Sequence, residues 1–187
     1  MRYFLDTEFN EEVDPVGLIS IGMVADDGRE FYAVNNLYMP SDTFESESCN
    51  DWVKRNVLPK LFAHLPQDET VKFPIMTVEK IRDGLKDFVG NDPFPEFWAY
   101  YGAYDWYLTC RLFGRFDQQP KAWAKAGNIC FDVKQFAKHY GVQKLLKKLE
   151  PEHNALIDAR WTKTAFDFVV ALRDKKLTPE QIQETWP

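Results

Sequence analysis

Alternating and continuous apolar positions dominate the first 35 residues of the chain. The run RYFLDTEF at residues 2–9 is apolar and aromatic apart from Thr7 and the carboxylates Asp6 and Glu8. Two β-rich runs follow within residues 17–35, and the Asp-Asp-Gly sequence between them is typical of a hairpin turn. This pattern predicts a three-stranded antiparallel meander.

Apolar residues then change to helical spacing. Residues 51–63 and 77–89 each carry apolar side chains at intervals of three and four, with Pro59 limiting the first helix and Thr77 suited to cap the second. The polar stretch at residues 39–49 separates these helices from the meander and is expected to be a loop.

The second half of the chain alternates strand and helix patterns. The expected strands are 97–101 and 128–133, the expected helices are 103–113, 133–141 and 152–173, and residues 177–187 form a short tail. Gly102 suits the turn between the first of these strands and its helix, and Gly141 suits a helix end. The order of elements predicts an α/β protein with a mixed five-stranded sheet flanked by helices. We expect residues 1–187 to form a single domain.

Composition narrows the class of protein. Hydrophobic residues make up 45% of the 187 residues, which argues against disorder, and the longest apolar runs are shorter than the roughly 20 residues of a membrane helix. We therefore expect no membrane association, and because the start of the chain lacks a secretory signal pattern we expect a cytoplasmic protein. The cysteines Cys49, Cys110 and Cys130 have neither the number nor the spacing of a disulfide framework or a zinc site.

The charge balance restricts how a nucleic acid could bind. A net charge of −6 provides no general attraction for a polyanion, so such a substrate requires bound cations or a local basic patch. The residues that could form such a patch are Lys144, Lys147, Lys148, Arg160 and Lys163. An ordinary solvated face explains them equally well.

Asp6 and Glu8 carry the first chemical signal. Residues i and i+2 of a strand face the same side, so the two carboxylates project together and could bind Mg²⁺ or Mn²⁺ through hard oxygen ligands. The same D/E-x-E spacing recurs at residues 45–47, so solvated acids on an edge strand are the alternative. The apolar flanks on both sides of Asp6 and Glu8 favour the metal site.

Asp105 follows the expected strand at 97–101. Ligands of α/β sheets bind at this edge, although an acid in the first turn of a helix also interacts favourably with the helix dipole. His153 and Asp158 lie five residues apart, about 140° of rotation on one helix, which is too far for both to face one site. We therefore expect the last helix to begin after His153, with Asn154 as its cap.

His153 is suited to act as a general base because its pKa lies near neutrality, whereas hard cations prefer oxygen ligands. A surface histidine preceding a helix is the alternative interpretation. His64 and His139 are weaker candidates, because the first lies in an expected packing helix and the second has a lysine five residues later.

The ordered set D-x-E, then D after a strand, then H-x4-D resembles the DEDDh family of 3'-to-5' exonucleases. This resemblance implies a ribonuclease H-like fold and two Mg²⁺ ions, or Mn²⁺ in their place, roughly 4 Å apart. In the implied arrangement Asp6 bridges both ions, Glu8 and Asp158 complete the site of the ion that activates water, and Asp105 supports the other ion. His153 is the implied base, and because no tyrosine takes its place at the shorter spacing, the histidine subgroup is favoured.

Further motifs are similar to the polyadenylate-specific bacterial exoribonucleases of the exoribonuclease AS group. They are RYFLDTEF, LISIG, DGREFYAV, VLPKL, GAYDW, LFG and HNALIDAR, which cover about half of the chain. Residues 39–50, 64–76 and 115–130 offer no match. This similarity implies single-stranded RNA or RNA 3' overhangs as substrate, release of nucleoside 5'-monophosphates, a preference for adenylate, and a homodimer.

The same resemblance implies that the terminal nucleotide is bound by Asp6, Thr7, Glu8, Phe9 and His153. Phe9 and, with less support, Trp106 are candidates for stacking on bases because each follows an acidic motif residue. Two alternatives stay open, a proofreading-type DNA exonuclease and a nucleic-acid-binding module without turnover. The complete set of acids argues against the second alternative, because a mere binder would be harmed by so many unpaired carboxylates.

Overall fold

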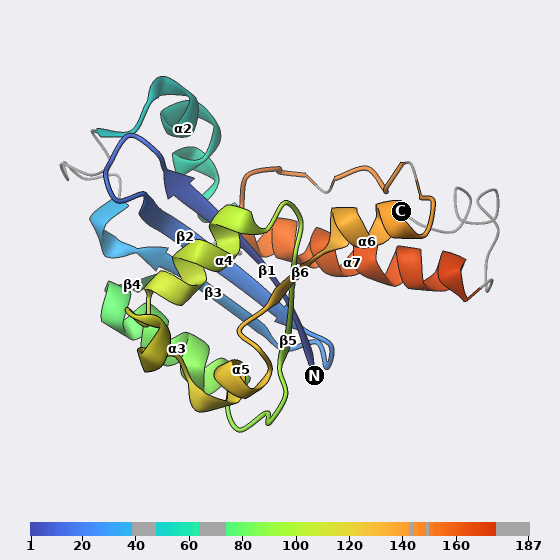
Figure 1. Ribbon diagram of the computed structural model, residues 1–187. Helices are drawn as coiled ribbons and strands as arrows, with labels where there is room; N and C mark the ends of the chain where they lie inside the picture. The colour runs from blue at the N-terminus through green and yellow to red at the C-terminus, as the bar shows by residue number, and fades with distance from the viewer. Residues whose placement is uncertain (39–47, 64–73, 143, 149, 175–187) are drawn as a thin grey trace.

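A six-stranded mixed sheet runs through the centre of the protein (Figure 1). This computed structural model describes residues 1–38, 48–63, 74–142, 144–148 and 150–174. The strands are β1 (Arg2–Asn10), β2 (Gly17–Ala25), β3 (Glu30–Asn35), β4 (Ile75–Met76), β5 (Glu96–Ala99) and β6 (Cys130–Asp132), in the spatial order β4-β3-β2-β1-β5-β6. The pairs β1–β2 and β2–β3 are antiparallel, whereas β1–β5, β5–β6 and β3–β4 are parallel. The predicted meander and mixed sheet are therefore confirmed.

The expected number of five strands is wrong, because β4 adds a strand at the edge. It pairs Ile75 with Val34 and Met76 with Asn35, and the amide of Val34 donates to the carbonyl of Pro74 at 2.9 Å. A strand of two residues is too short to show a two-residue alternation in the sequence. Only the neighbouring β3 makes it a strand.

Helices cover both faces of the sheet (Figure 1). One face is covered by α3 (Val78–Val89), α4 (Ala103–Arg111) and α5 (Lys121–Lys125). The other face carries α7 (Ala155–Arg173), with α2 (Asp51–Asn56) and α6 (Val133–His139) beside it. Along β1, Tyr3 and Leu5 join the core on the α3 face, whereas Phe4 packs on Phe166 of α7 with ring centroids 5.2 Å apart. The alternation of β1 thus assigns its even-numbered residues to the face under α7.

The helices match the sequence patterns with shorter boundaries. Thr77 caps α3, since its hydroxyl accepts from the amide of Lys80. The helix expected over 51–63 ends at Asn56 and continues as a 3-10 turn, η2 (Leu58–Lys60), because Pro59 has no amide hydrogen to donate and would clash with the preceding turn. Two further 3-10 turns are η1 (Asn36–Tyr38) and η3 (Phe116–Gln118).

Some expectations concern segments outside the described residues. They are most of the loop at 39–49, His64, and the tail at 177–187. Among the helices that are described, none has both the length and the apolar character required to cross a membrane.

Candidate active site

Three carboxylates from two elements meet on the α7 face of the sheet. Asp6 and Glu8 project from β1, and Asp158 comes from the first turn of α7. Each offers one oxygen, and these oxygens all lie within 4.8 Å of one another. We call Asp6, Glu8 and Asp158 the acidic triad. The two-residue alternation of β1 is what places its two members side by side.

Gly22 of β2 allows α7 to approach the sheet at this point. In the β1–β2 ladder Gly22 is the partner of Asp6. A Cβ atom on Gly22 would lie 2.3 Å from the carbonyl oxygen of Ala155 and 2.5 Å from Cα of Leu156, distances that no real side chain shows. The start of α7 therefore rests on bare backbone, which brings Asp158 close to Asp6. This role of Gly22 was not predicted, although a glycine inside the apolar run at residues 18–25 is a signal of close approach.

Asn154 fixes the start of α7. Its side-chain oxygen accepts from the amides of Leu156 and Ile157, both at 3.2 Å, which confirms the expected cap. Its side-chain amide donates to the carbonyls of Lys60 and Leu61 at 2.8 and 3.2 Å. The fully buried Asn154 thus ties the first turn of α7 to the end of η2.

His153 lies next to the acidic triad in an unusual backbone conformation. Its φ of 67° is in the left-handed region, and its amide donates to Oδ2 of Asp158 at 2.9 Å. Its imidazole meets the ring of Trp52 edge-on, with centroids 4.8 Å apart and planes at 78°. Burial, followed by the positive charge of Lys60, lowers the pKa of His153. At neutral pH the imidazole is therefore uncharged and able to accept a proton.

Asp105 stands beside the acidic triad without joining it. It lies in the first turn of α4, and its Oδ1 accepts from the amide of Thr7 at 2.8 Å and from the hydroxyl of Thr7 at 2.6 Å. Burial raises the pKa of Asp105 to about 6, and the two bonds from Thr7 act against that shift. The charge of Asp105 still acts on Asp6. Thr7, a candidate for substrate binding, therefore binds Asp105, the fourth carboxylate of the predicted site.

The buried carboxylates of the triad repel one another. Burial raises the pKa of Asp6 well above its ordinary value, and the charges of Asp105, Glu8 and Asp158 raise it further. Burial and then the charge of Asp158 raise the pKa of Glu8 to about 8. The positive charge of Lys148 works in the opposite direction on Asp6 and Glu8. Closely spaced acceptor-only oxygens of this kind fit a hard divalent cation such as Mg²⁺ or Mn²⁺, whose charge would remove the repulsion.

The two aromatic candidates have different surroundings. A bulge between Glu8 and Phe9 interrupts the β1–β2 register, and the ring of Phe9 stacks on Tyr104 with centroids 5.0 Å apart and planes at 17°. Tyr104 is 47% exposed. Trp106 instead packs against Phe97 in the core and donates its indole N–H to the carbonyl of Asn128 at 3.1 Å. The structure therefore uses the ring of Trp106 for packing and gives no support to its stacking on a base.

The basic residues around the third motif are largely paired. Lys148 contacts Asp158 at 2.7 Å, Arg160 binds Glu30 through two nitrogens at 2.7 and 2.6 Å, and Lys163 contacts Asp167 at 2.6 Å. Lys144 and Lys147 are exposed. The expected patch is therefore a set of ion pairs with two exposed lysines. Trp52 and Lys60 also approach His153, and neither was predicted, because only the packing of α2 and η2 places them there.

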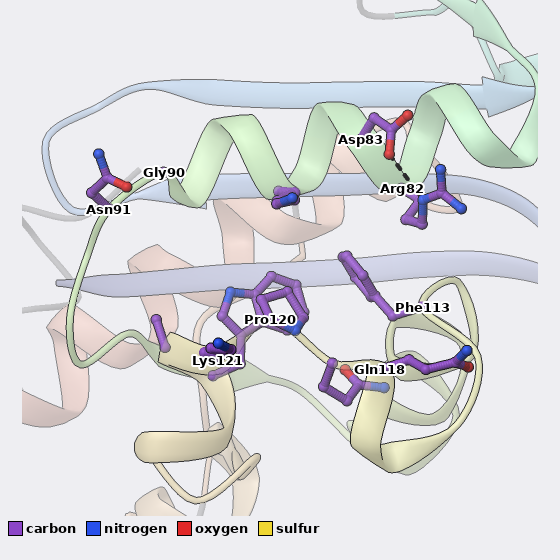
Figure 2. Close-up of a pocket in the computed structure, with 12 residues that line it drawn as sticks. Arg82, Asp83, Gly90, Asn91, Phe113, Gln118, Pro120 and Lys121 are labelled. Carbon is purple, nitrogen blue, oxygen red and sulfur yellow. Dashed lines mark hydrogen bonds and ion pairs between the residues drawn. The ribbon is translucent and has the colours of Figure 1, made fainter.

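Two cavities in the described part of the chain lie apart from the triad. One of about 780 Å³ separates α3 from residues 113–123, and its walls include Arg82, Lys86, Phe113 and Trp123 (Figure 2). A second cavity of about 410 Å³ is lined mainly by apolar side chains, including Val16, Leu18, Leu108 and Leu112. Neither contains a carboxylate of the triad, so the candidate site is identified by its chemistry.

Comparison with known proteins identifies a family for this chain. A family model described as the 3'-5' exoribonuclease Rv2179c-like domain matches residues 1–170, a range that includes both β1 and the first turns of α7. Two proteins of Mycobacterium tuberculosis are each 34% identical to this chain over 177 residues, which is 93% of the chain and 96% of the relative. Both are named 3'-5' exoribonucleases, Rv2179c in strain H37Rv and MT2234.1 in strain CDC 1551.

Proposed function

The chain belongs to the 3'-5' exoribonuclease Rv2179c-like family, and on that premise we propose that it is a metal-dependent 3'-to-5' exoribonuclease. It hydrolyses the terminal phosphodiester of RNA and releases nucleoside 5'-monophosphates. The observation that carries the proposal is the convergence of Asp6, Glu8 and Asp158 within 4.8 Å, with the backbone of His153 hydrogen-bonded to Asp158. The mixed sheet with its opening antiparallel meander supports the ribonuclease H-like fold that the sequence resemblance implies.

Asp6, Glu8 and Asp158, with Asp105 at their edge, would hold two divalent ions, Mg²⁺ or Mn²⁺. Such ions supply positive charge that offsets the charge developing on the phosphate and on the departing 3' oxygen. His153 then takes the proton of the attacking water at an imidazole nitrogen, because its lowered pKa keeps the ring neutral. The water oxygen forms the new bond to phosphorus, and the bond from phosphorus to the 3' oxygen of the preceding nucleotide breaks.

The RNA end is held beside β1. By the sequence resemblance, groups of Thr7, Glu8 and Phe9 cradle the terminal nucleotide, and the ring of Phe9, supported by its stack on Tyr104, contacts a base of the single strand. The resemblance to polyadenylate-specific exoribonucleases supports a preference for adenylate and a homodimer. A contact to the 2'-hydroxyl would select RNA over DNA.

Digestion of end-labelled homopolymers tests this function. RNA of each base and the matching DNA are incubated with Mg²⁺ and, in parallel, with a chelator. We expect 5'-labelled RNA to shorten from its 3' end in the presence of Mg²⁺ and to stay intact with the chelator. Shortening should be fastest for oligoadenylate, and the products should be nucleoside 5'-monophosphates. Equal shortening of DNA would favour a proofreading-type exonuclease, and retention of RNA without shortening would favour a binding module.

Variants of α7 locate the chemistry. Asp158→Asn removes one carboxylate of the triad, whereas Asp167→Asn removes an acid of the same helix that pairs with Lys163. We expect the first variant to abolish shortening and the second to act like the wild type. Normal turnover by Asp158→Asn would refute the site.

A further inference from the structure

A lysine of the chain pairs with the triad. Nζ of Lys148 lies 2.7 Å from Oδ1 of Asp158, while Oδ2 of Asp158 accepts from the amide of His153. The side chain of Asp158 is 4% exposed and that of Lys148 is 30% exposed. Both oxygens of the carboxylate are therefore bound by groups of the protein itself.

The position of Lys148 is fixed by α7. The indole N–H of Trp161, one turn after Asp158, donates to the carbonyl of Lys147 at 3.0 Å. Nζ of Lys148 lies 5.3 Å from the centroid of the Trp161 ring. Trp161 is buried, so it holds the backbone beside Lys148 and offers a face on which the cation can rest. This anchoring distinguishes Lys148 from the exposed Lys144 and Lys147.

The charge of Lys148 reaches the whole acidic group. It acts on Asp6, Glu8 and Asp105 in addition to Asp158, so the ammonium partly neutralises every carboxylate that the proposed function assigns to metal binding. A divalent cation that uses Asp158 must compete with this ion pair. The RNA that follows is a polyanion, and the chain carries a net charge of −6.

We propose that Lys148 is an exchangeable counter-cation. It pairs with Asp158 in the metal-free protein, gives way when a divalent ion binds, and then pairs with a phosphate of the RNA. This inference rests on the proposed function. It adds a means of regulating that function, because Lys148 sets the affinity for the metal and couples metal binding to substrate binding.

Metal titration without RNA tests the first half of the exchange. Lys148→Met keeps an apolar stem on Trp161 and removes the charge, Lys148→Arg keeps the charge, and Lys147→Met is the matched control. We expect the Met variant at 148 to bind Mn²⁺ about tenfold more tightly in calorimetry, because a unit charge a few Å away opposes cation binding strongly. We expect Lys148→Arg and Lys147→Met to match the wild type. Circular dichroism of the metal-free proteins checks folding, and Lys148→Gln replaces Lys148→Met if that variant does not fold.

Kinetics at saturating Mn²⁺ test the second half. We expect Lys148→Met to raise KM for oligoadenylate about tenfold, the usual loss when a charged partner of a phosphate is removed, and Lys148→Arg to restore it. Unchanged Mn²⁺ affinity or unchanged KM in Lys148→Met would overturn the exchange. Neither result would contradict the proposed function, which fails only if the wild type does not shorten RNA. The Mn²⁺ titration requires no turnover.

Discussion

Gly22 in β2 lies directly against Ala155, the first residue of α7. A Cβ atom at Gly22 would come within 2.3 Å of the Ala155 carbonyl oxygen, and Gly22 is also the ladder partner of Asp6. The missing side chain therefore sets how closely α7 approaches the strand that carries the other two acids. Asp158 reaches Asp6 and Glu8 only because of that approach.

Substitution of Gly22 by alanine should separate the two halves of the site. The new methyl group meets backbone that cannot yield, so α7 must shift, at a cost of about 1–3 kcal/mol in the free energy of unfolding. A displacement of about 1 Å lowers turnover by about 100-fold. Thermal unfolding and RNA digestion measure the two effects.

Gly84→Ala is the matched control for Gly22→Ala. Its methyl group would meet the ring of Phe31 at 2.7 Å, which is a side chain that can move, and Gly84 lies within α3, where alanine is the better helix former. We expect full activity in this variant. Full activity in Gly22→Ala as well would show that the approach of α7 to β2 does not control the site.

Local patterns in the sequence were sufficient for much of this arrangement. The two-residue alternation of β1 predicted that Asp6 and Glu8 share a face. On one continuous helix His153 and Asp158 would point in different directions, which predicted that the helix is capped by Asn154. These inferences succeeded because each depends on the geometry of one element. The strand pairing of the first 35 residues was also local, since a short turn joins the two later strands of the meander.

Other features depend on contacts between distant segments and could not be predicted. The two residues of β4 form a strand only beside β3. Trp52 contacts His153 because Asn154 binds the start of α7 to the end of η2. Trp106 packs on Phe97 and donates its indole N–H to the carbonyl of Asn128. No local pattern distinguishes a tryptophan that packs from one that contacts a substrate.

His153→Asn separates the imidazole from the backbone conformation at this position. Asparagine tolerates the left-handed region, so the amide of residue 153 continues to donate to Asp158. Loss of the base should lower kcat by about 100- to 10,000-fold. His139→Asn, an exposed site on α6, is the control and should keep wild-type activity.

The pH dependence of kcat/KM gives a second measurement on His153. Burial and Lys60 lower the pKa of the imidazole, so the base form persists below the ordinary range of histidine. We expect the acid limb of the wild-type profile below that range, with activity falling as the ring gains a proton. If the acid limb is the same in His153→Asn, another group is the base.

Trp52 is expected to position His153. An edge-on aromatic contact is worth about 0.5–1.5 kcal/mol, so loss of the ring in Trp52→Ala should lower kcat by about twofold to tenfold if the contact holds the imidazole for catalysis. Trp52 is 52% exposed, so the unfolding temperature should change little. Trp52→Phe should recover part of the rate, and Phe94→Ala, at an exposed aromatic side chain in the loop before β5, should have no effect. A change in KM alone would assign Trp52 to substrate binding.

Glu8→Gln should stabilise the metal-free protein in mildly alkaline solution. Burial and Asp158 raise the pKa of Glu8 to about 8, whereas glutamate in the unfolded chain ionises near 4.3, about its ordinary value. The folded state therefore holds the extra proton, so this contribution to stability is fully present in acid and is lost as the pH rises to about 8. Above that pH the glutamine variant should be more stable than the wild type by roughly 1 kcal/mol or more.

Metal binding should reverse the order of stability between Glu8→Gln and the wild type. A cation bound to the complete triad stabilises the wild type by about 2.7 kcal/mol at one hundred times its Kd, and the neutral amide of the variant binds the cation more weakly. Calorimetric unfolding across the pH range, with chelator and then with Mg²⁺, measures both effects, and Glu11→Gln at an exposed carboxylate of the same hairpin is the control. If the wild type and Glu8→Gln show the same pH profile in chelator, Glu8 titrates as an ordinary solvated acid. The repulsion on which the proposed cation site depends would then be absent.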